Sequence, residues 1–360
     1  MDEEKAVKRT TKTDFTVYNS ITLDMSQGFR LHEDTLSQQA VDLICKQPGV
    51  QNERYLYRNT TDDRNVVVDY GFENLVCEST FSDDSGIVQK DCNGYNLTTV
   101  NESENRYLGN IMGASENFWN DILVFEGEKD RNVLKEKMIT GEYVIIGCTM
   151  DRSTEEPDST PLTDELQVGD SISFYKDGEL VKTCTILAKA IMVGTELETP
   201  MGTSAQMNIG GDAPFVYLSD NAFKQIYNVP TLLSYGFNVD KTMQAQMEEF
   251  LNAYKENDSS VAYTSTKLLK EQMYAQRDIL LIVGGMIGVI LAFAGLINFT
   301  NMMVTNIITR RHEFAAMQSI GMTNRQLRRL IVDEGLYYAA GADVIGGLLA
   351  AILGMTVLKN

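Results

Sequence analysis

Five arginines lie close together between residues 309 and 330, in a chain whose formal net charge is −19 at pH 7. They are Arg310, Arg311, Arg325, Arg328 and Arg329, in the segment TRRHEFAAMQSIGMTNRQLRRL. Guanidinium groups form paired hydrogen bonds with phosphates and carboxylates, so these side chains can bind lipid headgroups or an acidic protein surface. Apolar residues recur in the same segment at helical spacing, which adds a short apolar face. Charge and apolar surface together favour a site at which another molecule docks.

The rest of the chain offers no comparable set of residues for catalysis or metal binding. Its two histidines, His32 and His312, have no Cys or His neighbour at the spacing of metal ligands. The sequence contains no GxSxG nucleophile motif, no phosphate-binding loop and no EF-hand spacing. We therefore expect a non-catalytic protein with no metal site, no directly bound cofactor and no nucleic-acid partner.

Two apolar runs flank the arginines. Residues 279–299 form a run of 21 residues without a charge, and as a helix this run would be about 31 Å long, close to the roughly 30 Å hydrocarbon core of a bilayer. Residues 335–358 form a second run, which contains a single charge, Asp343. Buried core helices are the alternative, but such helices seldom stay apolar on every face over this length. We predict transmembrane helices at 278–300 and 335–358.

The charge distribution predicts how these helices are oriented. Short loops rich in arginine stay in the cytoplasm, so segment 301–334 should be cytoplasmic. Residues 1–278 hold 46 of the 50 acidic and 25 of the 31 basic residues, so 1–277 should form an acidic extracytoplasmic domain. The opening residues MDEEKAVKRTTKTDF lack the apolar region of a signal peptide. We therefore expect this chain to be a fragment of a longer membrane protein, without an upstream transmembrane helix.

Residues 1–277 show the irregular mixture of strands and helices that is typical of an α+β domain. Residues 166–191 contain two alternating runs joined at Asp177-Gly178, which predicts a β-hairpin. Apolar periodicity and capping residues predict helices at 36–46, 217–228 and 242–256.

The five cysteines are dispersed, odd in number and without a CxxC pair, so they do not indicate a disulfide framework. Cys77 and Cys92 bracket an acidic stretch, and their pairing stays open. Cys148, in the β-rich run EYVIIGC, is expected to be a small core residue of a strand.

The arginine-rich segment should be structured rather than slack. Arg310 and Glu313 are spaced to form an ion pair on a helix, Gly321 can end that helix, and Thr323 with Gln326 can form the capping box of the next one. Arginines that only contact lipid phosphates would explain the charge but not the apolar face or the break. We therefore expect a docking surface formed by Arg310, Arg311, Glu313, Phe314, Met317, Gly321, Thr323 and Gln326.

Small residues within the two apolar runs suggest helix packing. Gly284 and Gly288 are four residues apart in the first run, and Gly346 and Gly347 lie in the second. Such spacing lets another helix approach closely, so we expect partner helices there. Asp343, an acid at membrane depth, could mark a functional site or pair with another helix, and both readings stay open.

The segment INFTNMMVTNIITRRHEFAAMQSIGMTNRQLRRLIVDEGLYYA, residues 297–339, resembles the FtsX/MacB-like permease family of ABC transporters. The resemblance rests on asparagines at a helix end, an R-x-x-E run, a glycine, a Thr-x-x-Gln turn and the entry into the next span. Its residue strings QSIGMT and EGLYY are most similar to those of permeases from Gram-positive bacteria. In this chain these features are Asn298, Asn301, Arg310 to Glu313, Gly321, Thr323 to Gln326, and Glu334-Gly335.

The resemblance implies a permease subunit that couples ATP hydrolysis to movement of an extracytoplasmic domain, for export, extraction or sensing of peptides or lipids. ATP would be bound by a separate cytoplasmic ABC ATPase that docks on the loop. Other partners would be further transmembrane helices or a second permease copy, and the lipids of a bacterial plasma membrane, which the protein would cross several times. The family's first and last transmembrane helices would be missing here.

Two other classes of protein remain as alternatives. A membrane-anchored sensor or binding module without an ATPase would need a cytoplasmic signalling domain, for which segment 301–334 is short. An extracytoplasmic enzyme on a membrane anchor would need a clustered polar site.

The predicted topology can be tested by thiol labelling in intact cells. A cysteine introduced by Ser319→Cys should resist a membrane-impermeant maleimide, whereas Asn257→Cys should react, because only the second position would face outward. The unmodified chain serves as the background for native cysteines. Labelling at position 319 from outside would reverse the orientation.

Overall fold

The computed structural model describes residues 12–20, 35–72, 75–82, 87–100, 105–120, 122–150, 157–158, 161–191 and 209–357. The chain forms two compact units, Met1–Met273 and Tyr274–Asn360. His32 lies outside the described residues.

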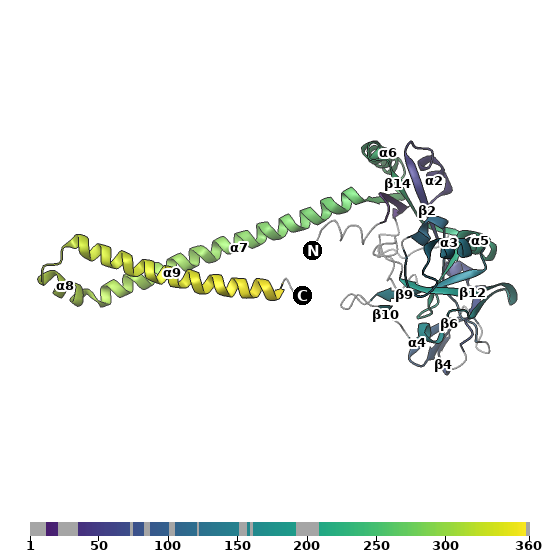
Figure 1. Ribbon diagram of the computed structural model, residues 1–360, viewed down its shortest axis with the longest axis horizontal. Coiled ribbons are helices and arrows are strands. Elements are labelled where there is room, and N and C mark those ends of the chain that lie inside the picture. The colour runs from purple at the N-terminus through teal and green to yellow at the C-terminus, as the bar shows by residue number, and fades with distance from the viewer. Residues whose placement is uncertain are drawn as a thin grey trace. The chain divides into compact units, whose positions relative to one another are not determined.

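A large mixed sheet is the framework of the first unit (Figure 1). Most neighbouring strands in it are antiparallel, but β9 runs parallel to β12, and β7 runs parallel to β13. Within the described residues the sheet has twelve strands. Along its main path they are β15 (Val261–Ser265), β1 (Phe15–Asn19), β14 (Thr231–Val239), β2 (Val50–Arg58), β7 (Asn110–Ala114), β13 (Phe215–Ser219), β9 (Tyr143–Met150), β12 (Glu179–Ile191), β11 (Ser171–Lys176) and β3 (Val66–Asp69), with β10 (Pro157–Asp158) on β9 and β8 (Leu123–Gly127) on β12.

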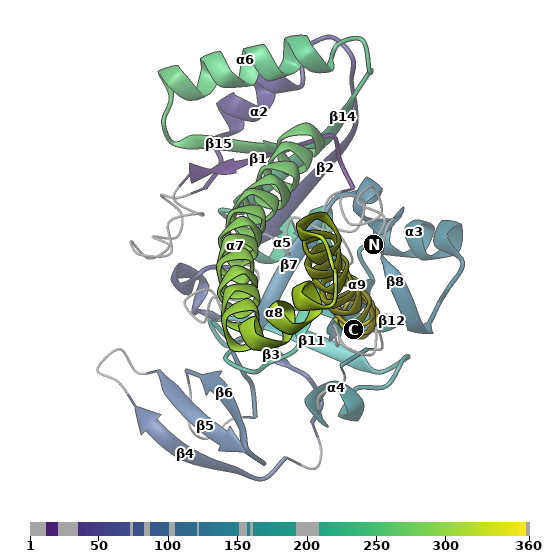
Figure 2. The ribbon, with the colours of Figure 1, turned by 90° about the vertical axis from the view of Figure 1, so that its left-hand side faces the viewer.

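Short helices cover this sheet, and the described aliphatic and aromatic side chains form two buried clusters. Figures 1 and 2 both show α2 and α6 beside β14, and their buried side chains join the larger cluster. The second cluster contains Trp119 and Met138, from η4 and α3. The bounds are α2 (Gln38–Ile44), η3 (Thr61–Asp63), η4 (Glu116–Asn120), α3 (Arg131–Ile139), α4 (Pro161–Glu165), α5 (Asp220–Ile226) and α6 (Gln244–Asn257).

The predicted α+β class is confirmed, and so are the main local predictions. β11 and β12 form the expected hairpin, with Asp177 and Gly178 both at positive φ (51° and 83°) in the turn. The helix predicted at 217–228 begins only at Asp220, because Tyr217 to Ser219 pair with β7 as the end of strand β13. The Ser219 side chain then accepts a hydrogen bond from the backbone N–H of Ala222 and caps the helix.

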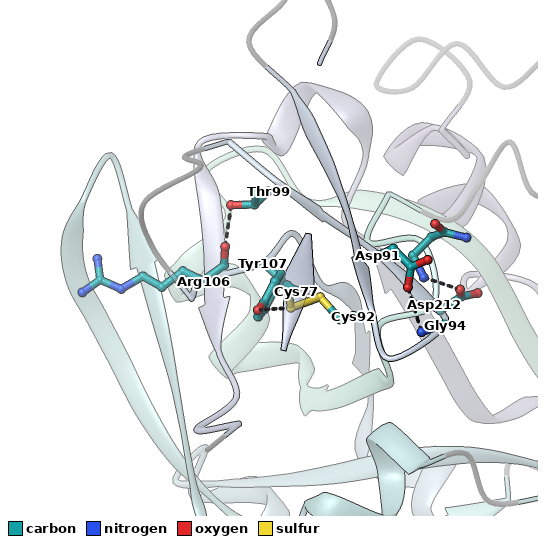
Figure 3. The surroundings of a disulfide bond; sticks show 9 residues. Cys77, Asp91, Cys92, Gly94, Thr99, Arg106, Tyr107 and Asp212 are labelled. Atoms are coloured by element: carbon teal, nitrogen blue, oxygen red, sulfur yellow. Dashed lines mark hydrogen bonds between the residues drawn. A yellow bond between two sulfur atoms is a disulfide. The ribbon is translucent and has the colours of Figure 1, made fainter. Parts of the chain in front are cut away.

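A separate small sheet contains a disulfide bond, Cys77–Cys92 (Figure 3). Its strands β4 (Cys77–Ser82), β5 (Val88–Cys92) and β6 (Tyr95–Thr99) are antiparallel, and the two cysteines lie directly opposite each other in the register. The structure therefore settles the pairing that the sequence left open. The five cysteines do contain a bonded pair, which the dispersed spacing did not indicate.

The remaining cysteines are free, and two of them are poor nucleophiles. Burial raises the pKa of both Cys148 and Cys184 to about 11, so these thiols stay protonated at neutral pH. Cys148 lies in strand β9 as expected, although it is only half-buried rather than part of the core.

The second unit consists of helices. α7 (Thr266–Thr309) and α9 (Asn324–Val357) carry the two apolar runs, and the short helix α8 (Arg311–Ser319) joins them (Figure 1). Both long helices have the length and composition needed to cross a membrane. Their apolar side chains are exposed, as at Leu280 (72%) and Val332 (59%), so they are not the core helices of a soluble domain.

Both helices extend beyond the predicted membrane bounds, 278–300 and 335–358, which remain predictions. α7 begins 12 residues before position 278 and continues to Thr309, and α9 begins at Asn324. Apolar composition marks the part of a helix that suits lipid, whereas backbone hydrogen bonding can continue past it. Most of segment 301–334 is therefore helical, and the connection that is not helical is short.

Removing the disulfide should loosen the small sheet selectively. In Cys77→Ser with Cys92→Ser, loss of the cross-link over 15 residues should cost about 3 kcal/mol, because the opened chain regains conformational entropy. Amide hydrogen exchange of β4, β5 and β6 in the full chain would measure this cost. Cys45→Ser, at a free cysteine, is the matched control and should leave that exchange unchanged. Equal exchange in the double variant and the wild type would show that the bond does not stabilise the sheet.

Candidate functional site

The arginine-rich turn begins with a helix that is ended by a glycine. α8 stops at Ser319, and Gly321 follows at φ +112°, a conformation that favours glycine. The Gly321 N–H donates to the Gln318 carbonyl (3.0 Å) and the Met322 N–H to the Met317 carbonyl (3.1 Å), which is the Schellman pattern. The prediction that Gly321 ends the helix is confirmed.

The next helix begins with the predicted capping box. The Thr323 N–H donates to the Gln326 side-chain oxygen (2.9 Å), and the Gln326 N–H donates to the Thr323 hydroxyl (3.4 Å). The side chain of Gln318 also donates to Asn324 (2.6 Å) across the break. The turn between α8 and α9 is therefore short and internally hydrogen-bonded.

One arginine links three helices. Arg310, between α7 and α8, donates from Nε to Glu313 Oε2 (2.8 Å), which confirms the expected pair. Its Nη1 also donates to both oxygens of Glu334 on α9 (3.1 and 3.0 Å), and Asn306 Nδ2 lies 3.5 Å from the same carboxylate. The hydrogen bond to Glu313, with the charge of Glu334, raises the pKa of Arg310 above its ordinary value. The sequence resemblance contained Glu334 but did not predict this partner.

The other four arginines of the turn are exposed and have no ion-pair partner among the described residues. Arg310 therefore differs from them, because it is committed to contacts within the chain. Free guanidinium groups remain available to an anionic partner. They are Arg311, Arg325, Arg328 and Arg329.

The apolar residues of the turn are placed differently from the prediction. Phe314 is only 7% exposed and is the single buried residue of α8, with the Arg310 guanidinium 5.4 Å from its ring centre. Its ring therefore packs inside the turn, and its role in docking stays a prediction. Met317 is half-buried, whereas Ile320 is 88% exposed. Ile320 shares the predicted apolar spacing with Phe314 and Met317 but was not among the predicted docking residues, and it is the most exposed large apolar side chain of residues 309–330.

A close approach of α7 and α9 occurs at Gly335. This glycine is buried, and a Cβ atom there would lie 3.3 Å from Met303 Cε and 3.7 Å from Phe299 Cζ. A larger side chain at this position would press on Met303 and Phe299, a contact between helices that the sequence alone does not reveal.

The glycines predicted to pack face open space within this chain. A Cβ atom at any of them would meet no described atom within 4 Å. Packing against helices of another protein stays a prediction for Gly284, Gly288, Gly346 and Gly347. Asp343 is also exposed on α9, without a hydrogen-bond partner among the described residues, and its role stays a prediction.

The described residues include no group of three or more His, Cys, Asp or Glu side chains that could hold a metal ion. His312, at the start of α8, is exposed.

Residues 285–360 match the family model described as FtsX-like permease C-terminal. The C-terminal part of the chain is therefore similar to an FtsX-like permease. The resemblance inferred at residues 297–339 is thus confirmed, because the matched region contains the whole turn. This matched region includes α9 and most of α7, the two helices that have the length and composition to cross a membrane.

Two solved structures are similar to the chain at low sequence identity. The periplasmic region of MacB from Actinobacillus actinomycetemcomitans has 8% identity and a TM-score of 0.36, over 74% of this chain and 95% of that one. The extracellular domain of the noncanonic ABC-type transporter YknZ from Gram-positive bacteria has 7% identity and a TM-score of 0.33, over 70% and 99%. None of the curated proteins matches the chain.

A larger side chain at position 335 should separate α9 from α7. In Gly335→Leu the side chain would clash with Met303 and Phe299, whereas Ala340→Leu adds similar bulk at an exposed position of α9. Overpacking of this kind commonly costs about 1–3 kcal/mol. Thermal unfolding of the full chain in detergent should show a lower midpoint for Gly335→Leu alone. Equal midpoints for the two variants would contradict the close approach.

Proposed function

We propose that this chain is the permease subunit of an ABC transporter of the mechanotransmission type. A separate cytoplasmic ATPase binds and hydrolyses ATP, and the movement of its subunits displaces α8. The observation that carries this proposal is the continuity of α7, a single helix of 44 residues that runs from strand β15 to the turn before α8. An unbroken helix transmits displacement along its axis, whereas a flexible linker would absorb it.

The first turn of α7 is attached firmly to the sheet domain. Thr266 follows the last residue of β15 without a linker, and its N–H donates to the Asp14 carbonyl (3.0 Å). The Asp14 carboxylate in turn accepts from the N–H of Val239, at the end of β14 (3.0 Å). Lys267 pairs with Glu248 on α6 (2.7 Å). Movement of α7 would therefore act directly on β15, β1 and β14.

The disulfide supports an extracytoplasmic position for the sheet domain. Such bonds persist in oxidising compartments and are rare in the cytosol. Cys77–Cys92 lies in the acidic domain, which precedes the apolar run of α7 in the sequence, and the free arginines follow that run. Both features favour a plasma membrane protein with its domain outside and its turn in the cytoplasm.

We propose that the ATPase docks on the exposed side of the turn. Ile320 supplies an apolar contact, and the free arginines supply charge for acidic groups on the partner. Phe314 and the Arg310–Glu313 pair would hold the shape of this surface from within. ATP would thus reach the system only through the partner, and export, extraction or sensing of peptides or lipids would be the work of the outer domain.

Docking can be tested by comparing apolar residues that differ in exposure. Ile320→Ala should reduce co-purification of the ABC ATPase from the native cells, because truncation of a central apolar contact commonly costs about 2 kcal/mol. Leu330→Ala, at a less exposed apolar position in α9, is the matched control. Thermal stability of the permease should be unchanged in both variants. Wild-type co-purification of Ile320→Ala would remove Ile320 from the docking surface.

A further inference from the structure

We propose that Glu334 is a positioning residue which, through Arg310, fixes the docking helix α8 to α9 as well as to α7. The inference rests on the proposed function, because a fixed α8 matters only if a partner moves it. With this link in place, displacement of α8 would move both long helices together. Without it, α8 would be held to α9 only at the turn that follows Ser319, and displacement of α8 would move α9 less.

The contacts of Arg310 with Glu313 and Glu334, called the Arg310 joint below, link three helices, unlike a simple surface ion pair. Its guanidinium contacts α8 through Glu313 and α9 through Glu334, and its own backbone N–H donates to the Asn306 carbonyl of α7 (3.1 Å). Both carboxylate oxygens of Glu334 accept from the same nitrogen. Charge-assisted contacts of this kind are stronger than neutral hydrogen bonds.

Partial burial makes this joint more effective. The side chains of Arg310 and Glu334 are 31% and 28% exposed, so solvent and salt screen their attraction less than that of a fully exposed pair. The Phe314 ring lies beside the guanidinium and is buried. Charged contacts and apolar packing thus occur at the same place.

The position of Glu334 along α9 explains how it can set the relation between the helices. It immediately precedes Gly335, at which α9 lies against Met303 of α7. The carboxylate therefore projects from the level at which the two long helices are in contact. Residues 320–323 and the hydrogen bond from Gln318 to Asn324 connect the other end of α8 to α9. The contact of Arg310 with Glu334 adds a connection at the start of α8.

The sequence offers a matched control. Asp333 is the neighbouring acid on α9, but it is exposed and has no ion-pair partner among the described residues. Glu334→Gln and Asp333→Asn each remove one negative charge with little change in volume. A general effect of charge near the membrane should appear in both variants, whereas the joint predicts an effect only in Glu334→Gln.

The first measurement is amide hydrogen exchange of α8 in the full-length permease, reconstituted in lipid nanodiscs without ATPase. Glu334→Gln should accelerate exchange of residues 311–319 about tenfold, as expected for loss of a hydrogen bond between charged groups. Asp333→Asn should not. Unaltered exchange in Glu334→Gln would overturn the joint itself.

The second measurement is ATP hydrolysis by the permease–ATPase complex purified from the native cells. If Glu334 positions α8, Glu334→Gln should lower the kcat that the permease supports several-fold, with KM for ATP and the amount of bound ATPase unchanged. Faster exchange of α8 with a wild-type kcat would overturn the positioning role. Absence of any ABC ATPase from the wild-type preparation would overturn the proposed function instead, and with it the role of Glu334 in coupling.

Discussion

A bilayer interior offers no water to backbone N–H and C=O groups, so each must find its partner within the protein. Helices meet this requirement along their length but leave free groups at their ends. In this chain α7 and α9 cover the apolar runs without a break, and the unsatisfied ends meet at the turn. Gly321 and Met322 satisfy the end of α8, and Thr323 with Gln326 satisfies the start of α9. These hydrogen bonds within the chain order the turn.

An ordered turn can hold its charges in fixed places, and here the arginines have separate roles. Arg310 is held by two carboxylates and organises three helices, whereas the other four side chains point to solvent without such partners among the described residues. Had all five been free, the segment would suit electrostatic attraction to lipid alone. The combination of one committed arginine, a buried Phe314 and an exposed Ile320 favours a shaped surface for a protein partner.

The sheet domain is joined to the start of α7 at one end of its large sheet. β15 leads directly into α7, and β1 lies between β15 and β14 in the sheet. The hydrogen bonds of Asp14 join the start of α7 to β1 and β14. The disulfide-bonded sheet β4–β5–β6 is separate from this region in the strand order. Movement entering at β15 would therefore act first on this end of the large sheet.

The sequence alone determined the features that depend on local chemistry. Apolar length predicted the two long helices, Asp177-Gly178 predicted a hairpin, and Gly321 with Thr323 and Gln326 predicted a break and a cap. Tertiary structure decided the rest. Whether Cys77 bonds Cys92 depends on strands that place them opposite each other, and the joint of Arg310 with Glu334 depends on α9 folding back beside α7. The same return of the chain buries Gly335 against Met303. Contacts between residues distant in sequence are set by how helices and strands pack. A single sequence does not show which distant residues come into contact.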